Sequence, residues 1–196
     1  LLSFVPEDVY RVGIDPVGFL CREAEQYSDE IVNDYFTVKC LDGYTPFDVI
    51  TSISCFYDMP DPNQFVADVA KMLDKNGVWI IQQNYLLTTV ELSAVDNFCH
   101  EHLEYYTLKS LENLLNKHDL EVNELYTSMV NGGSIRTIVS HKGTFDVDES
   151  VYLQRDREED YLLNTLATYK DFASKVMVEL NKLHRLVKEA KDNGQT

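Results

Sequence analysis

The sequence predicts an α/β protein with a parallel sheet, antiparallel edge strands and a long C-terminal helix. Short β-like runs alternate with helical patterns through the first half of the 196-residue chain. Two further strands flank a glycine-containing turn near residue 132. A regular apolar repeat then occupies the last part of the chain, as in a long amphipathic helix.

The first strands and helices follow one another closely. Tyr10–Asp15 predicts a strand that ends in an acid, and Pro16 and Gly18 open a helical pattern behind it. A second strand is predicted over residues 47–54, and a helix with an apolar face over residues 63–73.

The segment after this helix predicts a turn and a third strand. Asn76–Gly77 is typical of a helix C-terminal turn. Val78–Ile81 is apolar throughout, so we expect this strand to be covered on both faces.

The pattern then changes from parallel to antiparallel. A helix is predicted from Thr107 to about Lys117 and a strand from Leu120 to Tyr126. The turn Asn131–Ser134 separates that strand from Ile135–Val139. Two strands joined by so short a connection predict the antiparallel edge of the sheet.

The last segment carries apolar residues at alternating steps of four and three: Leu162, Leu166, Tyr169, Ala173, Val176, Leu180, Leu183 and Val187. This heptad pattern predicts one helix from about Asp156 to Ala190. Its narrow apolar stripe suits a helix–helix contact, including a homodimer, but it also suits a helix that packs on its own domain.

Charge and hydropathy exclude some partners. The chain holds 17 basic and 33 acidic residues, a formal net charge of −16, which disfavours non-specific nucleic-acid binding. No apolar run approaches the roughly 18 residues that span a bilayer. The first residues lack a basic segment and a cleavage site, so we expect no signal peptide, no membrane partner and a cytoplasmic location.

Asp15 is the first candidate binding residue. An acid at the end of an early strand can accept hydrogen bonds from both ribose hydroxyls of a nucleotide. Many strands also end in Asp because the side chain caps the following helix. Position alone leaves both interpretations open.

His100-Glu101-His102 is the densest cluster of titratable groups. It could ligate a metal, although no convincing third ligand is present, so we expect no metal site. It could provide a general base, since a histidine titrates near neutral pH. It could also be a polar turn, but the neighbouring aromatics Phe98, Tyr105 and Tyr106 favour a small-molecule pocket.

The turn Asn131–Ser134 and the following Arg136 allow two interpretations. Paired glycines let backbone N–H groups approach an anion, and Arg can bind it bidentately. A tight hairpin turn without a ligand is the simpler interpretation and the one we favour.

Several of these motifs together resemble a known family. Asn84-Tyr85-Leu86, Asp96–Tyr106 with its His-Glu-His-Leu core, and Gly132-Gly133-Ser134-Ile135-Arg136 occur in this order along the chain. They are similar to motifs of the S-adenosylmethionine-dependent C-methyltransferases that act on nucleotide-linked 4-keto-deoxysugars. Cys99 departs from the family pattern, which usually has Tyr there.

The resemblance implies a truncated Rossmann-like class I methyltransferase sheet, S-adenosylmethionine as cofactor and a nucleotide sugar as substrate. His102 would be the base that removes the proton α to the sugar ketone, with Glu101 and His100 supporting it. The enolate would then take the methyl group, its oxygen held by Asn84, Tyr85 or Tyr105. The family would bind substrate also at Ser134 and Arg136, and cofactor at Asp15, Asp34, Tyr35, Ser54, Cys55 and Phe56.

The resemblance also implies a domain organisation. Residues 1–150 would be a methyltransferase domain without the family's zinc domain and glycine-rich cofactor turn, so the isolated chain should bind cofactor weakly. Residues 151–196 would be a long helix leading to a further domain. Two alternatives stay open: an assembly module that dimerises through this helix, and a metal-dependent hydrolase centred on His100 and His102.

Overall fold

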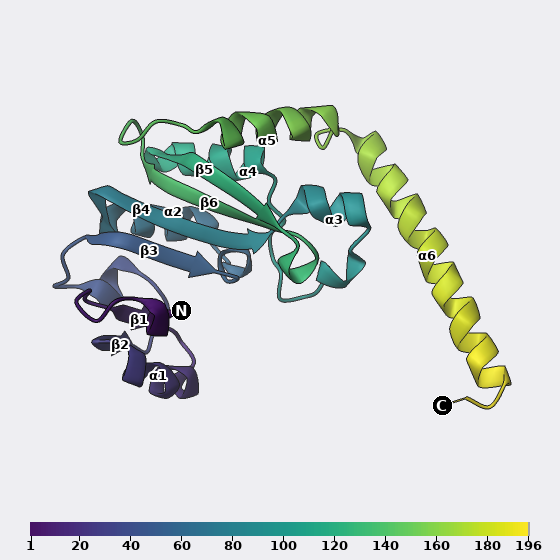
Figure 1. Ribbon diagram of the computed structural model, residues 1–196, viewed down its shortest axis with the longest axis horizontal. Coiled ribbons are helices and arrows are strands. Elements are labelled where there is room, and N and C mark those ends of the chain that lie inside the picture. The colour runs from purple at the N-terminus through teal and green to yellow at the C-terminus, as the bar shows by residue number, and fades with distance from the viewer. Residues whose placement is uncertain (196) are drawn as a thin grey trace.

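The computed structural model describes residues 1–195. It contains two sheets (Figure 1). In the smaller, β1 (Val12–Ile14) and β2 (Glu30–Val32) pair in parallel. The larger sheet has the order β3-β4-β6-β5. Its strands are β3 (Phe47–Ile53), β4 (Leu73–Asn84), β5 (Leu120–Ser128) and β6 (Ser134–His141).

The larger sheet combines both pairing modes. β3 and β4 are parallel, whereas β6 is antiparallel to both β4 and β5. The α/β class and the antiparallel edge strands predicted from the sequence are therefore confirmed. Figure 1 shows the small sheet and the first helix set apart from the larger sheet.

Six α-helices connect and cover these strands: α1 (Gly18–Ala24), α2 (Pro62–Met72), α3 (Leu86–Leu92), α4 (Leu108–Leu115), α5 (Glu149–Asp160) and α6 (Leu166–Asp192). α2, α4 and α5 contact strands of the larger sheet and bury its core. The core centres on Phe56, Val69, Trp79, Leu111, Leu115, Val139 and Val151. No helix within residues 1–195 is long and apolar enough to cross a membrane.

The predicted turn at Asn76–Gly77 is wrong. Helix α2 ends at Met72, and Leu73 already has an extended backbone, so both turn residues belong to β4. A Cβ atom on Gly77 would lie 2.9 Å from the carbonyl oxygens of Phe47 and Asp48. The glycine is needed because β3 passes close by, not because a helix ends there.

The prediction that a single long helix begins at about Asp156 is also wrong. The chain forms α5, turns, and begins α6 at Leu166. Leu162 lies in the break with φ 56°, and the next residue, Leu163, is buried in the core. Burial of Leu163 turns the chain inward at a point where the heptad pattern alone predicts a continuous helix.

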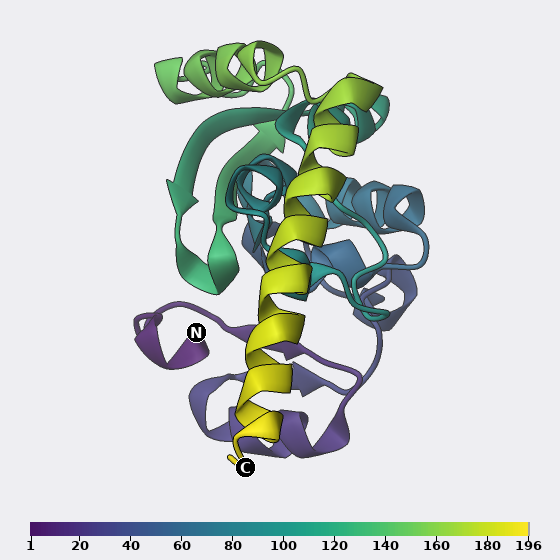
Figure 2. The same cartoon turned by 90° about the vertical axis from the view of Figure 1, so that its right-hand side faces the viewer.

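Helix α6 nevertheless confirms a long C-terminal helix. It contacts α3 near its start, and Figures 1 and 2 show the rest as a rod that leaves the body of the molecule. No residue of α6 is fully buried.

Candidate active site

Candidate residues gather at the carboxyl ends of the parallel strands, where α/β proteins place their ligand sites. Asp15 directly follows β1, Ser54 directly follows β3, and Asn84 ends β4. Burial raises the pKa of the Cys55 thiol, and the nearby carboxylates of Asp58 and Asp15 raise it further. β1 and β3 nevertheless belong to different sheets.

Asp15 combines the two roles that its position allows. One carboxylate oxygen accepts the backbone N–H of Val17 at 2.7 Å, directly before α1. The other makes no hydrogen bond within residues 1–195. A hollow of about 330 Å³ lies beside Asp15, lined mainly by apolar residues of β1, β2 and α1. A carboxylate with one committed and one uncommitted oxygen can cap a helix and still accept a ligand hydroxyl.

Asp34 and Tyr35 follow β2 at the same end of the small sheet. The Asp34 carboxylate accepts the N–H of Tyr35, whose side chain is exposed. Both side chains are accessible, and within residues 1–195 neither makes a hydrogen bond to the residues around His102.

The segment after β3 is strained at its first residue. Ser54 has φ 55°, a left-handed conformation that is uncommon for a residue with a side chain, and such strain clusters at functional sites. Cys55 follows it and is partly buried. Phe56 is fully buried, stacks on Tyr106 and meets Trp79 edge-on. The Phe56 ring belongs to the core, so a cofactor contact at this residue, which stays a prediction, would have to involve its backbone.

His102 is half-buried and held by one strong hydrogen bond. Its Nδ1 lies 2.8 Å from the carbonyl oxygen of Asn97, and its ring meets Tyr57 edge-on at 4.5 Å. A carbonyl oxygen can only accept, so Nδ1 carries a proton, and in the neutral ring Nε2 then keeps its lone pair. The ring is thus set to act as a base through Nε2.

His100 and Glu101 do not hold the His102 ring. Both are exposed, and neither makes a side-chain hydrogen bond to His102 within residues 1–195. The ring is held by Asn97 instead, and a supporting role of His100 and Glu101 in the reaction stays a prediction. Glu101 acts instead on Asp58: burial raises the pKa of the Asp58 carboxyl, nearby His102 lowers it, and Glu101 raises it.

Asn84 and Tyr105 lie in the same network as His102. The Asn84 amide donates to Oδ1 of Asn97 at 3.2 Å, and the Tyr105 hydroxyl donates to the Asn97 carbonyl at 3.2 Å. Oδ1 of Asn84 is buried without a partner, as is Oδ1 of Asp58. Two unpaired acceptors close to His102 mark positions where a bound molecule could donate hydrogen bonds.

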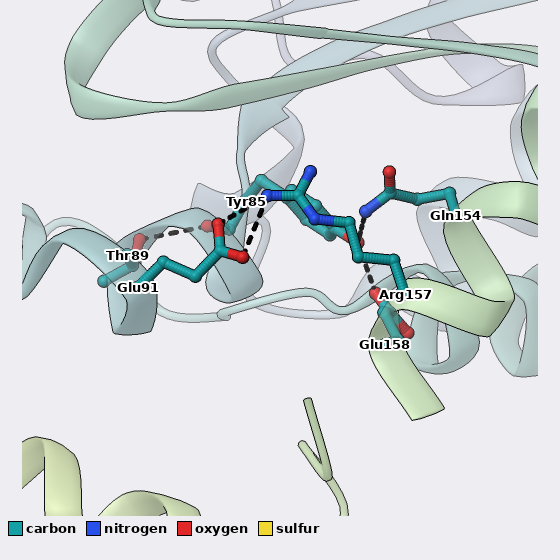
Figure 3. Close-up of polar contacts among 6 residues, drawn as sticks. All are labelled: Tyr85, Thr89, Glu91, Gln154, Arg157 and Glu158. Atoms are coloured by element: carbon teal, nitrogen blue, oxygen red, sulfur yellow. Dashed lines mark hydrogen bonds and ion pairs between the residues drawn. The ribbon is translucent and has the colours of Figure 1, made fainter. Parts of the chain in front are cut away.

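Tyr85 points toward Gln154 and Glu158 of α5 (Figure 3). Its side chain is fully buried, its hydroxyl donates to Glu158 at 2.7 Å, and it accepts from Gln154. Burial raises the pKa of Tyr85, and the Glu158 carboxylate raises it further, so the hydroxyl stays protonated. This hydroxyl joins the end of β4 to α5, which favours Asn84 and Tyr105 over Tyr85 as the substrate-binding residue.

The glycine turn before β6 is packed rather than open. A Cβ atom on Gly133 would lie 2.1 Å from a methyl group of Thr88, and the Gly133 N–H donates to Val130. Ser134 is buried and also bonds to Val130, while the exposed Arg136 donates to Gln82. These contacts agree with the favoured interpretation of a tight turn, and substrate binding at Ser134 and Arg136 stays a prediction.

Sequence reasoning missed Asn97, Tyr57 and Asp58. Asn97 stands five residues before His102, and nothing in its sequence context shows that its carbonyl would meet the ring. Tyr57 and Asp58 follow the strained Ser54 at a strand end, a position that could have drawn attention to them. Within residues 1–195, no three His, Cys, Asp or Glu side chains come together to hold a metal ion.

Comparisons with known proteins agree with this fold. A family model described as "Methyltransferase domain" matches residues 4–125, and one described as "C-methyltransferase C-terminal domain" matches residues 129–196. C-methyltransferase NovU of Streptomyces niveus is 28% identical over 128 residues, which cover 63% of this chain and 30% of NovU. The chain thus matches less than a third of that relative's length.

Two solved structures show the same fold. An S-adenosylmethionine-dependent methyltransferase from Clostridium acetobutylicum ATCC 824 has a TM-score of 0.53 at 15% identity, covering 69% of this chain and 76% of that chain. The plantazolicin methyltransferase BpumL, in complex with a triazolic desmethylPZN analog and SAH, has a TM-score of 0.51 at 13% identity and 68% coverage of both chains. The Rossmann-like class I architecture expected from the sequence is therefore confirmed.

Proposed function

Because the chain belongs to the methyltransferase-domain family, we propose that it serves a C-methyltransferase that uses S-adenosylmethionine and acts on a nucleotide-linked keto-deoxysugar. The observation that carries this proposal is the hydrogen bond between Nδ1 of His102 and the Asn97 carbonyl, which leaves Nε2 as a base. The match to a C-methyltransferase model supports methyl transfer to carbon.

The strand ends fit the cofactor in charge and chemistry. Asp15 offers an uncommitted carboxylate oxygen to ribose hydroxyls beside an apolar hollow. Asp34 and Tyr35 would lie against the adenosine, and Ser54 and Cys55 against the methionine part. Acidic groups such as Asp58 suit the positive charge of a sulfonium group, and the cofactor would supply an electrophilic methyl group.

The chain's own residues would carry out the proton transfer. Nε2 of His102 would take the proton from the carbon next to the sugar ketone, and the C–H electrons would form the enolate. The enolate carbon would then accept the cofactor's methyl group as the electron pair of the broken C–S bond passes to sulfur, leaving S-adenosylhomocysteine. An enolate oxygen needs a hydrogen-bond donor, and each such donor lowers the activation free energy by about 3 kcal/mol. Asn84 and Tyr105 remain candidates because both lie near His102. Asn84 has a second amide hydrogen for this role, whereas the Tyr105 hydroxyl would have to leave the Asn97 carbonyl.

Substitution of His102 tests the proposal. We expect His102→Ala to slow methyl transfer by at least roughly 100-fold, the usual worth of a general base. The matched control is His141→Ala, because His141 also bonds a backbone carbonyl, that of Leu73, at the opposite end of β4. His141→Ala should transfer methyl groups at the parental rate.

The assay follows methyl transfer to a nucleotide-linked 4-keto-deoxysugar by mass spectrometry, in the longest natural chain that contains these residues. Deuterium exchange at the α carbon measures proton removal separately. A His102→Ala protein that binds cofactor and still methylates at the parental rate would show that His102 is not the base.

We also propose that α6 pairs two copies of the chain. The specific observation is its unburied apolar stripe: Leu180, Leu183 and Val187 are 45%, 57% and 59% exposed. Heptad spacing of such residues is typical of helices that pack against another helix.

Sedimentation over a range of concentrations tests this pairing. The native chain should form a dimer as its concentration rises, and Leu180→Asp should abolish it by placing a charge in the seam. Lys182→Asp alters the charge on the same helix outside the seam and serves as the control. A native chain that stays monomeric at every concentration would remove this proposal.

A further inference from the structure

Asn97 connects three separate segments through four hydrogen bonds. Its Nδ2 donates to the Asn131 carbonyl at 3.2 Å, and its Oδ1 accepts from Asn84 at 3.2 Å. Its own carbonyl accepts from His102 and from Tyr105. Asn97 is only 8% exposed, so each lost partner would leave a buried polar group unpaired.

The turn Val130–Gly133 is braced on two sides. Gly133 allows close contact with Thr88 of α3, and a Cβ atom on Gly132 would come within 3.4 Å of Nδ2 of Asn97. Asn131 has φ 53°, which directs its carbonyl within reach of Asn97. The rigid turn therefore presents a fixed acceptor to the Asn97 side chain.

The tautomer of His102 depends on this arrangement. The Asn97 carbonyl lies 2.8 Å from Nδ1, whereas the Asn84 amide lies 3.4 Å from the same atom. The nearer carbonyl determines the proton position in the neutral ring, because a carbonyl oxygen can only accept and the Asn84 amide lies farther from Nδ1. If the carbonyl moved, the ring would be free to place its proton on Nε2 and lose its lone pair there.

We propose that Asn97 is a positioning residue: its side chain, clamped between Asn84 and the Val130–Gly133 turn, holds its own carbonyl where it keeps His102 in the Nδ1–H tautomer. The glycine-rich turn thus acts on the reaction through His102 and not through an anion. The effect on catalysis rests on the proposed function of His102, whereas the effect on the tautomer does not.

The chain contains a closely matched control residue, Asn123. It is 5% exposed, donates its amide to the Phe145 carbonyl at 3.1 Å and accepts from Ser140. Asn97→Asp and Asn123→Asp therefore make the same change. In each variant a carboxylate oxygen, which can only accept, replaces the amide group that donates to a backbone carbonyl. Only Asn97 is bonded to His102.

The experiment records ¹⁵N shifts of the histidine rings in the whole chain, at a pH where they are neutral. We expect native His102 as the Nδ1–H tautomer and His141, whose Nε2 faces a carbonyl, as the Nε2–H tautomer. Asn97→Asp should shift His102 toward Nε2–H, while Asn123→Asp should leave it unchanged. The native spectrum tests the proposal even if Asn97→Asp does not fold.

Kinetics separate this proposal from the proposed function. Asn97→Asp should lower kcat by roughly 10- to 100-fold, the usual cost of a misplaced catalytic group, with KM nearly unchanged. A tautomer shift without a fall in kcat would support positioning by Asn97 but contradict His102 as the base. An Nε2–H tautomer in the native chain, or an unshifted one in Asn97→Asp, would overturn the positioning role itself.

Discussion

Helices α5 and α6 follow one another in the chain but differ in burial: α5 has buried residues and α6 has none. α5 is rich in charged residues, yet Val151, Gln154 and Glu158 are buried. α6 carries a regular apolar stripe, yet none of its residues is fully buried. An apolar stripe thus indicates that a helix can pack against another apolar surface. It does not indicate that this surface belongs to the same domain.

Specific polar contacts explain why α5 docks. The Glu158 carboxylate accepts the Tyr85 hydroxyl and the backbone N–H groups of Leu108 and Lys109. These N–H groups belong to the first turn of α4, where a negative charge is stabilised by the helix dipole. Ion pairs at the α5 surface, such as Arg157 with Glu91 (Figure 3), contribute less because water screens them.

The largest effect in this comparison is expected from Glu158→Ala. The substitution leaves one hydroxyl and two backbone N–H groups without their acceptor in a buried place, so we expect the free energy of unfolding to fall by roughly 3 kcal/mol. Urea unfolding measures it. The neighbouring Glu159 is exposed, and Glu159→Ala should change stability by less than about 0.5 kcal/mol. Equal effects at both positions would contradict the anchoring role of Glu158.

Tyr85→Phe should have an intermediate effect. It removes one of three donors to Glu158 and keeps the aromatic ring in the core, so we expect a loss of about 1 kcal/mol. Tyr152→Phe is the matched control on α5, because its ring is 51% exposed. Urea unfolding measures the stability of both variants. A loss in Tyr85→Phe but not in Tyr152→Phe would show that the buried hydroxyl in particular stabilises the docked helix.

The smallest effect on stability is expected from Leu180→Asp in α6. At concentrations where the chain is monomeric, the free energy of unfolding should change by less than about 0.5 kcal/mol. The reason is that the Leu180 side chain is exposed, so its replacement removes no buried contact. Thermal or urea unfolding at low concentration measures it. A large loss under these conditions would mean that α6 packs on its own chain in solution.

The sequence predicted the elements whose signals are local. The apolar strand Val78–Ile81 and the glycine turn before β6 lie where periodicity and turn residues indicated. His102 was selected because its neighbours in sequence are aromatic and acidic, and its role as a base stays a prediction. Its partner was not selected, because Asn97 acts through a backbone carbonyl, which every residue has.

The amino-acid sequence by itself determined the α/β class, the antiparallel edge, the long final helix and the cluster around His102, because these depend on periodicity and on residue type. Only the tertiary structure decided which polar groups meet. In that structure Phe56 and Tyr85 are buried in the core, and the glycine turn packs on Thr88. The Asn97 carbonyl contacts the imidazole of His102. The reason is physical: contacts between groups distant in the chain depend on how the elements pack, and no local pattern records that packing.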